Sequence, residues 1–261
     1  MTGLYIERLR NLRPPLVAVA MMAPAALLVL YLWHSTPSAA PEHAMHLQSG
    51  GAWTRLVVFL TAWMLMTAGM MLPSAMPLLT SLDRIARNHA RRHEIPVFAT
   101  LAYMGIWGIV GLAAWVVSSA SEAYIVPNVD SRTVSWLAGG GLILAGAYGL
   151  SPLASACLRA CRRPFGFLAR YWRGGSAVRL QAARIGAAYG ISCVGCCVPM
   201  IGLMFVVGMA NIAIVISMGV LMVLMKTSAT GTRVARLLAY VLIGAGAAIS
   251  FAWLPLSPHQ H

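Results

Sequence analysis

Long apolar runs, separated by short polar and basic connections, fill most of the chain. Seven of these runs approach or exceed the roughly 17–25 residues that a helix needs to cross a bilayer. They lie near residues 15–33, 55–79, 96–118, 134–153, 184–207, 211–225 and 235–254. The pattern predicts an all-α fold, a polytopic transmembrane helix bundle of six to seven spans in a single integral membrane domain over residues 1–261.

Composition agrees with a membrane protein. The chain has 261 residues, of which 59% are hydrophobic and 10% charged, and its mean hydropathy is +0.76. Soluble domains have about 45–50% apolar and about 25% charged residues. The net charge of +13 comes almost entirely from arginines in the connections. Basic residues in the connections of a membrane protein indicate its orientation in the membrane. We therefore expect the partner to be the lipid bilayer and not nucleic acid.

The basic residues also orient the bundle. All 19 Lys and Arg residues except Arg55 and Arg132 fall in connections that the order of the spans places on one side. By the positive-inside rule this side is cytoplasmic, which predicts a cytoplasmic N-terminus and a multi-pass protein of the bacterial inner membrane. The longest connection, 154–183, is an Arg-rich cytoplasmic loop with interleaved aromatic residues. It is either an amphipathic segment on the inner leaflet or a solvated loop.

The fifth run contains the densest group of soft donor atoms, in the sequence CVGCCVPMIGLM. On a helix, Cys193, Cys197, Met200 and Met204 fall within an arc of about 60°, with Cys196 one step to the side. Thiolate and thioether sulfurs select Cu(I) and related soft metals. Cys193, Cys196, Cys197 and Met200 are therefore candidate metal ligands, although cysteine and methionine are also ordinary fillers of buried helices.

The second run carries a methionine-rich segment, WMLMTAGMMLPSAMP. Met66 and Met70 form a pair four residues apart, and Met71 lies toward the opposite face. Counting about 1.5 Å of rise per residue, Met66 and Cys193 lie at similar depths in the membrane, so Met66, Met70 and Met71 join the candidate ligands. Pro73 and Pro77 interrupt the hydrogen-bond ladder here. A methionine packing face with a proline kink explains the pattern equally well.

Two further groups are secondary metal candidates. Cys157 and Cys161 are four residues apart at the cytoplasmic end of the fourth span, where neighbouring arginines are expected to lower the thiol pKa values and favour the thiolate. This pair is a candidate hand-off site or an incidental one. On the outer side, the sequence PEHAMH is either a copper-binding loop or an ordinary loop. Its candidate ligands are His43, Met45 and His46.

Two polar residues near the sixth span complete the candidates. Asn211 belongs to the turn Gly208–Asn211, which predicts a tight hairpin between the fifth and sixth spans. Lys226 ends the sixth span at the membrane boundary, where it is either a site residue or a side chain that snorkels toward the polar surface. Glycines in the fourth and seventh spans favour close helix packing or oligomerisation.

These segments together resemble a known family. The sequences AWMLMTAGMMLPSAMP, SPLASACLRACRRPF and GISCVGCCVPMIGLMFVVGMAN, followed by Lys226, are similar to the bacterial family of predicted metal-binding integral membrane proteins, domain of unknown function family 2182. The resemblance covers residues 62–226. It implies that the protein binds a metal, with copper as the expected metal. The chain departs from the family pattern at Val198, where a tryptophan is common, and at Met225, where an acidic residue is usual.

The leading hypothesis is a copper-binding membrane protein that transports or stores the metal, or delivers it to a periplasmic cuproprotein or metallochaperone. One alternative is an intramembrane thiol-disulfide oxidoreductase, since Cys193 and Cys196 have C-x-x-C spacing. Another is a structural membrane subunit without metal. Few charges lie within the spans and no P-loop is present, which argues against proton-coupled or ATP-driven transport.

Overall fold

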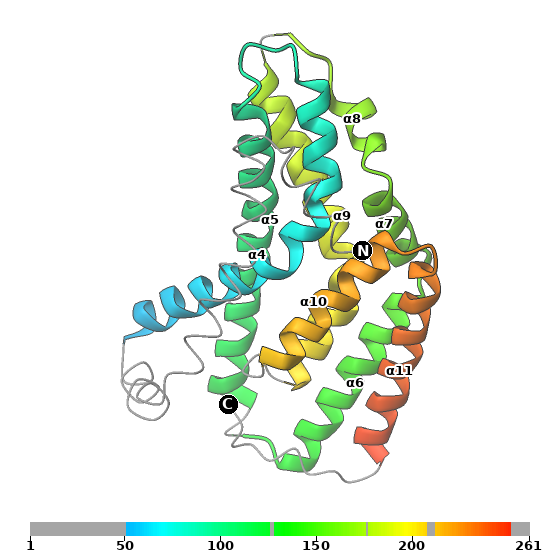
Figure 1. The fold of residues 1–261 in the computed structure, drawn as a ribbon. Helices are drawn as coiled ribbons and strands as arrows, with labels where there is room; N and C mark the ends of the chain where they lie inside the picture. Colours follow the sequence, from blue (N-terminus) through cyan, green and yellow to red (C-terminus); the bar gives the residue numbers. More distant parts are fainter. Residues whose placement is uncertain (1–50, 126–127, 176, 208–211, 252–261) are drawn as a thin grey trace. The chain divides into compact units, whose positions relative to one another are not determined.

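The computed structural model describes residues 51–125, 128–175, 177–207 and 212–251. Regular structure in these ranges is entirely helical (Figure 1), which confirms the predicted all-α fold. In chain order the helices are α4 (Ala52–Ile85), α5 (Glu94–Ala120), the short π-helix η1 (Ser121–Ile125), α6 (Ser131–Leu150), α7 (Pro152–Arg162), α8 (Phe165–Tyr171), α9 (Val178–Val207), α10 (Ile212–Thr227) and α11 (Gly231–Phe251).

Six of the predicted spans overlap described helices, with ends that differ by up to six residues. Five segments are long and apolar enough to cross a membrane: Ala52–Ile85, Glu94–Tyr124, Arg132–Leu150, Val178–Val206 and Gly231–Phe251. The predicted sixth span is the shorter apolar helix α10. The chain is thus a multi-pass membrane protein by length and composition. The run 15–33 and the Gly208–Asn211 turn lie outside the described residues.

Part of the long connection 154–183 is helical. It contains most of α7, all of α8 and the start of α9. Helix α7 has a buried face, and α8 buries Leu168. In α7 the buried residues are Ala154, Leu158 and Cys161. Their spacing of four and three residues is that of an amphipathic helix face. This part of the connection is therefore structured rather than an extended solvated loop.

The helices form two compact units. In its described part, the first contains α4, α8, α5 as far as Gly108 and α9 as far as Gly190, together with the connections between α4 and α5 and between α8 and α9. The second contains the later portions of α5 and α9 together with η1, α6, α7, α10 and α11. The predicted sulfur motifs divide between the units: the methionines of α4 belong to the first, and all five cysteines belong to the second.

In the first unit, α4 changes direction part-way along its length (Figure 1). Pro73 and Pro77 lie inside the helix, and a proline removes a backbone donor and bends the helix. Two tyrosines donate to backbone carbonyls beside these prolines: the Tyr189 hydroxyl to Ser74 at 3.1 Å and the Tyr103 hydroxyl to Met71 at 3.5 Å. Neighbouring helices thus supply polar partners to the bent segment.

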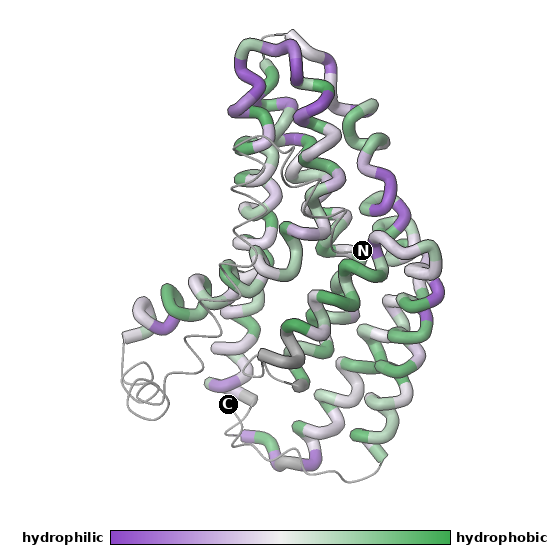
Figure 2. The backbone as a smooth tube through the Cα atoms, viewed as in Figure 1, coloured by the Kyte–Doolittle hydropathy of each residue, from purple (hydrophilic) through white to green (hydrophobic). Residues whose placement is uncertain are grey.

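The first unit also brings together two connections that the charge pattern predicts on the same side. The His89 ring lies 3.1 Å from the Gly175 carbonyl, and Arg179 forms an ion pair with Glu94 at 2.5 Å. Figure 2 shows hydrophilic residues gathered in these connections, beyond the largely hydrophobic helices. A membrane helix requires this division, because charged side chains are costly within hydrocarbon.

In the second unit, α6 and α11 pack closely through glycines. A Cβ added to Gly146 would lie 2.7 Å from the Ala239 carbonyl oxygen, and one added to Gly246 would lie 2.5 Å from the Gly139 carbonyl oxygen. The expectation that glycines allow close approach of the fourth and seventh spans is confirmed at these positions. The packed pair of α6 and α11 belongs to the same unit as the cysteines.

Candidate functional site

The sulfur-rich face of α9 points inward. Cys193 and Cys197 have no exposed surface, and Met200 and Met204 are 3% and 6% exposed. Cys196, one step to the side, is also buried. Residues at spacings of three and four share a helix face, so the predicted stripe exists as a buried feature of the second unit.

Helix α7 begins at a site that its sequence specifies. Ser151 precedes Pro152, and the Ser151 hydroxyl accepts a hydrogen bond from the Ala154 backbone N–H at 3.1 Å. Serine at the N-cap followed by proline in the first turn is a favoured helix start. The hydrogen bond satisfies one of the backbone N–H groups that the first turn of a helix leaves without a partner. Cys161 is buried, whereas Cys157 is only partly buried.

Gly195 explains how α7 approaches α9 so closely. A Cβ at this position would lie 2.6 Å from the Cys157 sulfur and 3.3 Å from the Cys157 Cβ. A contact below 3.0 Å forces a side chain to move. The glycine between Cys193 and Cys196 therefore makes space for α7, a role that its place in a cysteine motif does not reveal.

The two cysteine motifs meet across this interface. The Cys196 thiol lies 4.0 Å from the Cys161 sulfur. The prediction treated Cys157 and Cys161 as a secondary site apart from the α9 cysteines, and for Cys161 this was wrong. The short helix α7 folds back along α9, so a residue 35 positions earlier in the chain reaches the same group of sulfurs.

Helix α10 adds a methionine and an amine. The Met222 sulfur lies 3.9 Å from the Cys197 sulfur. The Lys226 amine donates to the Cys193 sulfur at 2.9 Å, and Lys226 is only 6% exposed. Of the two alternatives for this lysine, snorkelling to the membrane surface was wrong, because the side chain is buried and its amine donates to a buried sulfur.

Arg162 holds the end of α10 in place. Its guanidinium donates to the carbonyls of Met225 at 3.4 Å and Ser228 at 2.7 Å. Arginine is well suited to this role because several donors diverge from one planar group and the C-terminal carbonyls of a helix lack partners. Since Arg162 follows directly after Cys161, the contact ties the position of Lys226 to that of the α7 cysteine.

We use the term sulfur cluster for the side chains joined by these contacts: Cys161, Cys193, Cys196, Cys197 and Met222. The Cys197 sulfur lies 3.9 Å from those of Cys193, Cys196 and Met222 alike. Two sulfurs that bind one ion at about 2.3 Å are roughly 3.8 Å apart in a tetrahedral site. The sulfur pairs therefore have the spacing of shared ligands, and their donor type suits a soft metal.

The cluster is not a finished metal site. Among the described residues, no group of three or more His, Cys, Asp or Glu side chains is arranged to hold an ion. The cysteines are free thiols, and the Cys196 thiol donates to the Cys193 carbonyl at 3.1 Å. Binding of an ion by three sulfurs would require thiols to rotate away from their present hydrogen bonds.

The thiols of α7 do not have the lowered pKa expected from their arginine neighbours. Burial raises the pKa of the Cys157 thiol. Hydrogen bonds to Cys193 and Cys196, together with burial, raise the pKa of the Cys161 thiol well above its ordinary range. The expectation of thiolates here was wrong because burial and hydrogen bonds between thiols determine the direction of these shifts. The nearest arginine along the chain from Cys161, Arg162, donates to backbone carbonyls at the end of α10.

The remaining candidates lie elsewhere. Met66, Met70 and Met71 are buried, but in the first unit. Their participation in metal binding stays a prediction. Outside the described residues are the four candidates His43, Met45, His46 and Asn211.

Sequence reasoning missed Met222 and the inward position of Lys226. A signal was present: Met218, Met222 and Met225 recur at spacings of four and three residues, and all three are buried. Lys226, the only lysine in the chain, lies four residues after Met222 on the same helix. A methionine stripe that ends in a single lysine on an apolar helix differs from a simple snorkelling anchor.

Comparison with known proteins gives one result. A family model described as "PpoB2: Copper chaperone" matches residues 60–249. No curated protein and no solved structure matches the chain. The matched range includes every member of the sulfur cluster and Lys226, and also the methionines of α4.

Proposed function

We propose that this chain, which belongs to the PpoB2 family of copper chaperones, binds copper as Cu(I) at the sulfur cluster and passes the ion to a partner. Copper is the cargo in this proposal. The expected recipient is a periplasmic cuproprotein or metallochaperone, and the expected location is the bacterial inner membrane.

The observation that carries the proposal is the convergence of α7, α9 and α10 on one group of sulfurs. Four cysteines and a methionine, from three helices, are linked by contacts of 3.9 to 4.0 Å. Packing alone rarely requires that cysteines from separate segments meet. A buried group of soft donors favours a soft, weakly hydrated ion.

The surroundings of the cluster also support a soft ion over a hard one. The described carboxylates are Asp83, Glu94, Glu122 and Asp130. None of them belongs to α7, α9 or α10, the helices that supply the sulfurs. Mg²⁺ and Ca²⁺ prefer oxygen ligands, chiefly carboxylates. The donor set therefore lacks what hard cations require.

The proposal is tested by measuring copper in the purified full-length protein. We expect wild-type protein to retain Cu(I) in competition with a chelator under anaerobic, reducing conditions. Replacing Cys193, Cys196 and Cys197 together with serine should abolish binding, because serine oxygen is a poor ligand for a soft ion. Elemental analysis gives the stoichiometry and the chelator gives the affinity.

Two further variants keep the result interpretable. Cys157→Ser makes the same chemical change on a partly buried thiol outside the cluster and should leave binding unchanged. Cys197→Ser removes the sulfur that contacts three others, and we expect a loss of affinity of roughly 100-fold, about 2.7 kcal/mol. Helicity and elution volume must match wild type. Full copper retention by the folded triple variant would overturn the proposal.

Thiol trapping separates copper handling from the oxidoreductase hypothesis. A redox enzyme cycles its cysteines through a disulfide, so trapping before and after oxidation would show paired loss of Cys193 and Cys196 thiols. We expect copper instead to protect the cluster thiols from alkylation reversibly, with full recovery when a chelator removes the metal.

A further inference from the structure

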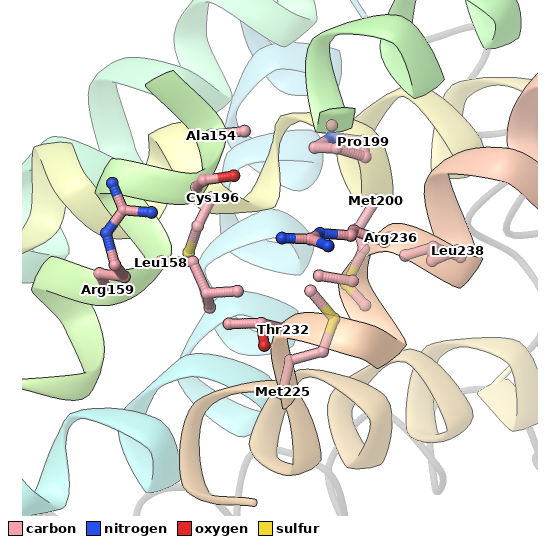
Figure 3. A pocket seen from close by; sticks show the side chains of 13 residues that line it. Ala154, Leu158, Arg159, Cys196, Pro199, Met200, Met225, Thr232, Arg236 and Leu238 are labelled. Carbon is pink, nitrogen blue, oxygen red and sulfur yellow. The ribbon is translucent and has the colours of Figure 1, made fainter. Parts of the chain in front are cut away.

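A small pocket opens beside the sulfur cluster in the second unit. Its volume is about 50 Å³, and α6, α7, α9, α10 and α11 all contribute to its walls. Three sulfur-bearing residues line it, Cys196, Met200 and Met225, each at most 5% exposed. Two arginines, Arg159 and Arg236, line it as well. Figure 3 shows Arg236 extending toward the centre of the pocket, with Arg159 at its edge.

Cys196 belongs both to this pocket and to the sulfur cluster. The other members of the cluster, Cys161, Cys193, Cys197 and Met222, are not among the residues that line the pocket. A ligand in the pocket therefore meets Cys196 first. From there the Cys197 and Cys161 sulfurs are 3.9 Å and 4.0 Å away, and the ion can move by exchanging one sulfur at a time.

The two arginines bring positive charge to the pocket. Both are exposed, in contrast to the buried sulfurs. Within the described part of the chain, neither guanidinium has a hydrogen bond or an ion pair with another residue. Guanidinium groups bind carboxylates well because their donors match the two carboxylate oxygens. An occupant with negative charge and a soft donor would satisfy both the arginines and the sulfurs.

We propose that this pocket receives Cu(I) as an anionic complex with a small, carboxylate-bearing thiol, and that Cys196 is the first residue to take the ion. The inference rests on the proposed function and assigns the class of copper donor. The pocket volume holds roughly three or four water-sized groups. This volume is sufficient for one thiol side arm and its metal, while the carboxylates of the donor contact Arg159 and Arg236.

The transfer is a ligand exchange without a change of oxidation state. The Cys196 sulfur forms a bond to Cu(I), one bond from copper to a donor sulfur breaks, and the Cys196 proton leaves with the departing thiol. The charge of the copper complex is unchanged, because one thiolate replaces another. A second exchange at the neighbouring Cys197 thiol releases the second donor in the same way and completes the transfer.

The first experiment needs no copper and therefore tests the pocket separately from the proposed function. In a Cys157→Ser background, small methanethiosulfonate reagents of opposite charge are added to the purified protein, and modified cysteines are identified by mass spectrometry. We expect Cys196 to react before the other cluster cysteines, and about tenfold faster with the anionic than with the cationic reagent. Replacing both Arg159 and Arg236 with glutamine should remove this preference.

The second experiment measures delivery. Cu(I) is supplied as its glutathione complex or as its complex with uncharged mercaptoethanol, and loading is followed by stopped-flow mixing. The Arg159→Gln, Arg236→Gln variant should load about tenfold more slowly from glutathione, with unchanged loading from mercaptoethanol and unchanged affinity at equilibrium. The matched control, Arg87→Gln with Arg233→Gln, removes the same charge from exposed positions outside the pocket and should behave as wild type.

Each contrary outcome has a definite meaning. If the protein binds no Cu(I), the proposed function is refuted. The reagent experiment then still tests whether the pocket gives anionic thiol reagents access to Cys196. Protein that loads equally fast with and without the pocket arginines refutes this inference alone. Loss of the charge preference in phosphatidylglycerol nanodiscs, but not in phosphatidylcholine nanodiscs, would show that the arginines hold lipid headgroups and would also overturn it.

Discussion

The methionine segment of α4 and the cysteine segment of α9 are both rich in sulfur, both buried and both close to a proline inside the helix. Their surroundings differ. Beside the bend of α4, hydroxyls from Tyr103 and Tyr189 donate to backbone carbonyls. The contacts of the α9 cysteines include other sulfurs and the Lys226 amine. The first environment stabilises a bent backbone, whereas the second gathers reactive side chains. Sulfur content alone therefore does not identify a site.

Lys226→Met should produce the largest effect on the cysteine side of this comparison. The change keeps an apolar stem and removes the amine that donates to Cys193. Hydrogen bonds that involve a charged group contribute about 1.5–3 kcal/mol, so we expect the free energy of unfolding in detergent to fall by about 2 kcal/mol. Arg233→Gln, on the exposed surface of α11, is the control. An unchanged unfolding free energy would mean that Lys226 only fills space.

Replacing Met66, Met70 and Met71 with leucine tests whether the two regions cooperate. Leucine keeps the volume and apolar character but has no sulfur. If these thioethers assist copper binding, as the sequence predicts, Cu(I) affinity should fall by about tenfold, equivalent to about 1.4 kcal/mol, with the stoichiometry retained. Chelator competition measures this. An unchanged affinity would assign the α4 methionines to packing and make the contrast between the regions complete.

Gly195→Ala probes the packing that brings α7 to the cysteines. The new methyl group would meet the Cys157 sulfur, and overpacking of this kind costs about 1 kcal/mol or more. Cys157→Ala in the same chain should restore most of the lost stability, because it removes the colliding atom. Gly140→Ala is the control, since nothing lies within 4 Å of the added atom. Thermal unfolding in detergent measures all three.

The smallest effect concerns the reactivity of Cys157. Since burial raises its pKa and alkylation requires the thiolate, we expect iodoacetamide to modify it more slowly at pH 7 than a free cysteine. The rate should rise toward its plateau at a higher pH than for a model thiol. A midpoint below the ordinary thiol pKa would instead support the lowering that the flanking arginines predict from sequence.

Local features of the site were predictable, and contacts between segments were not. The inward face of α9 follows from spacings within one helix, so Cys193, Cys197 and Met200 could be grouped from the sequence alone. The meeting of Cys161 with Cys196 depends on how α7 folds back after Ser151. The inward turn of Lys226 depends on a partner in another helix. The hydropathy pattern places that lysine at the membrane boundary. It is calculated within one segment and contains no information about contacts between helices.

The sequence by itself determined the helices, their apolar length and the single face on which the α9 sulfurs lie, because these depend on residues within a few turns of one another. Only the tertiary structure decided which sulfurs meet, where Lys226 points and which cysteine lines the pocket. Those properties arise when α7, α9, α10 and α11 pack together. Glycine gaps and one arginine, side chains without metal chemistry of their own, permit and hold that packing.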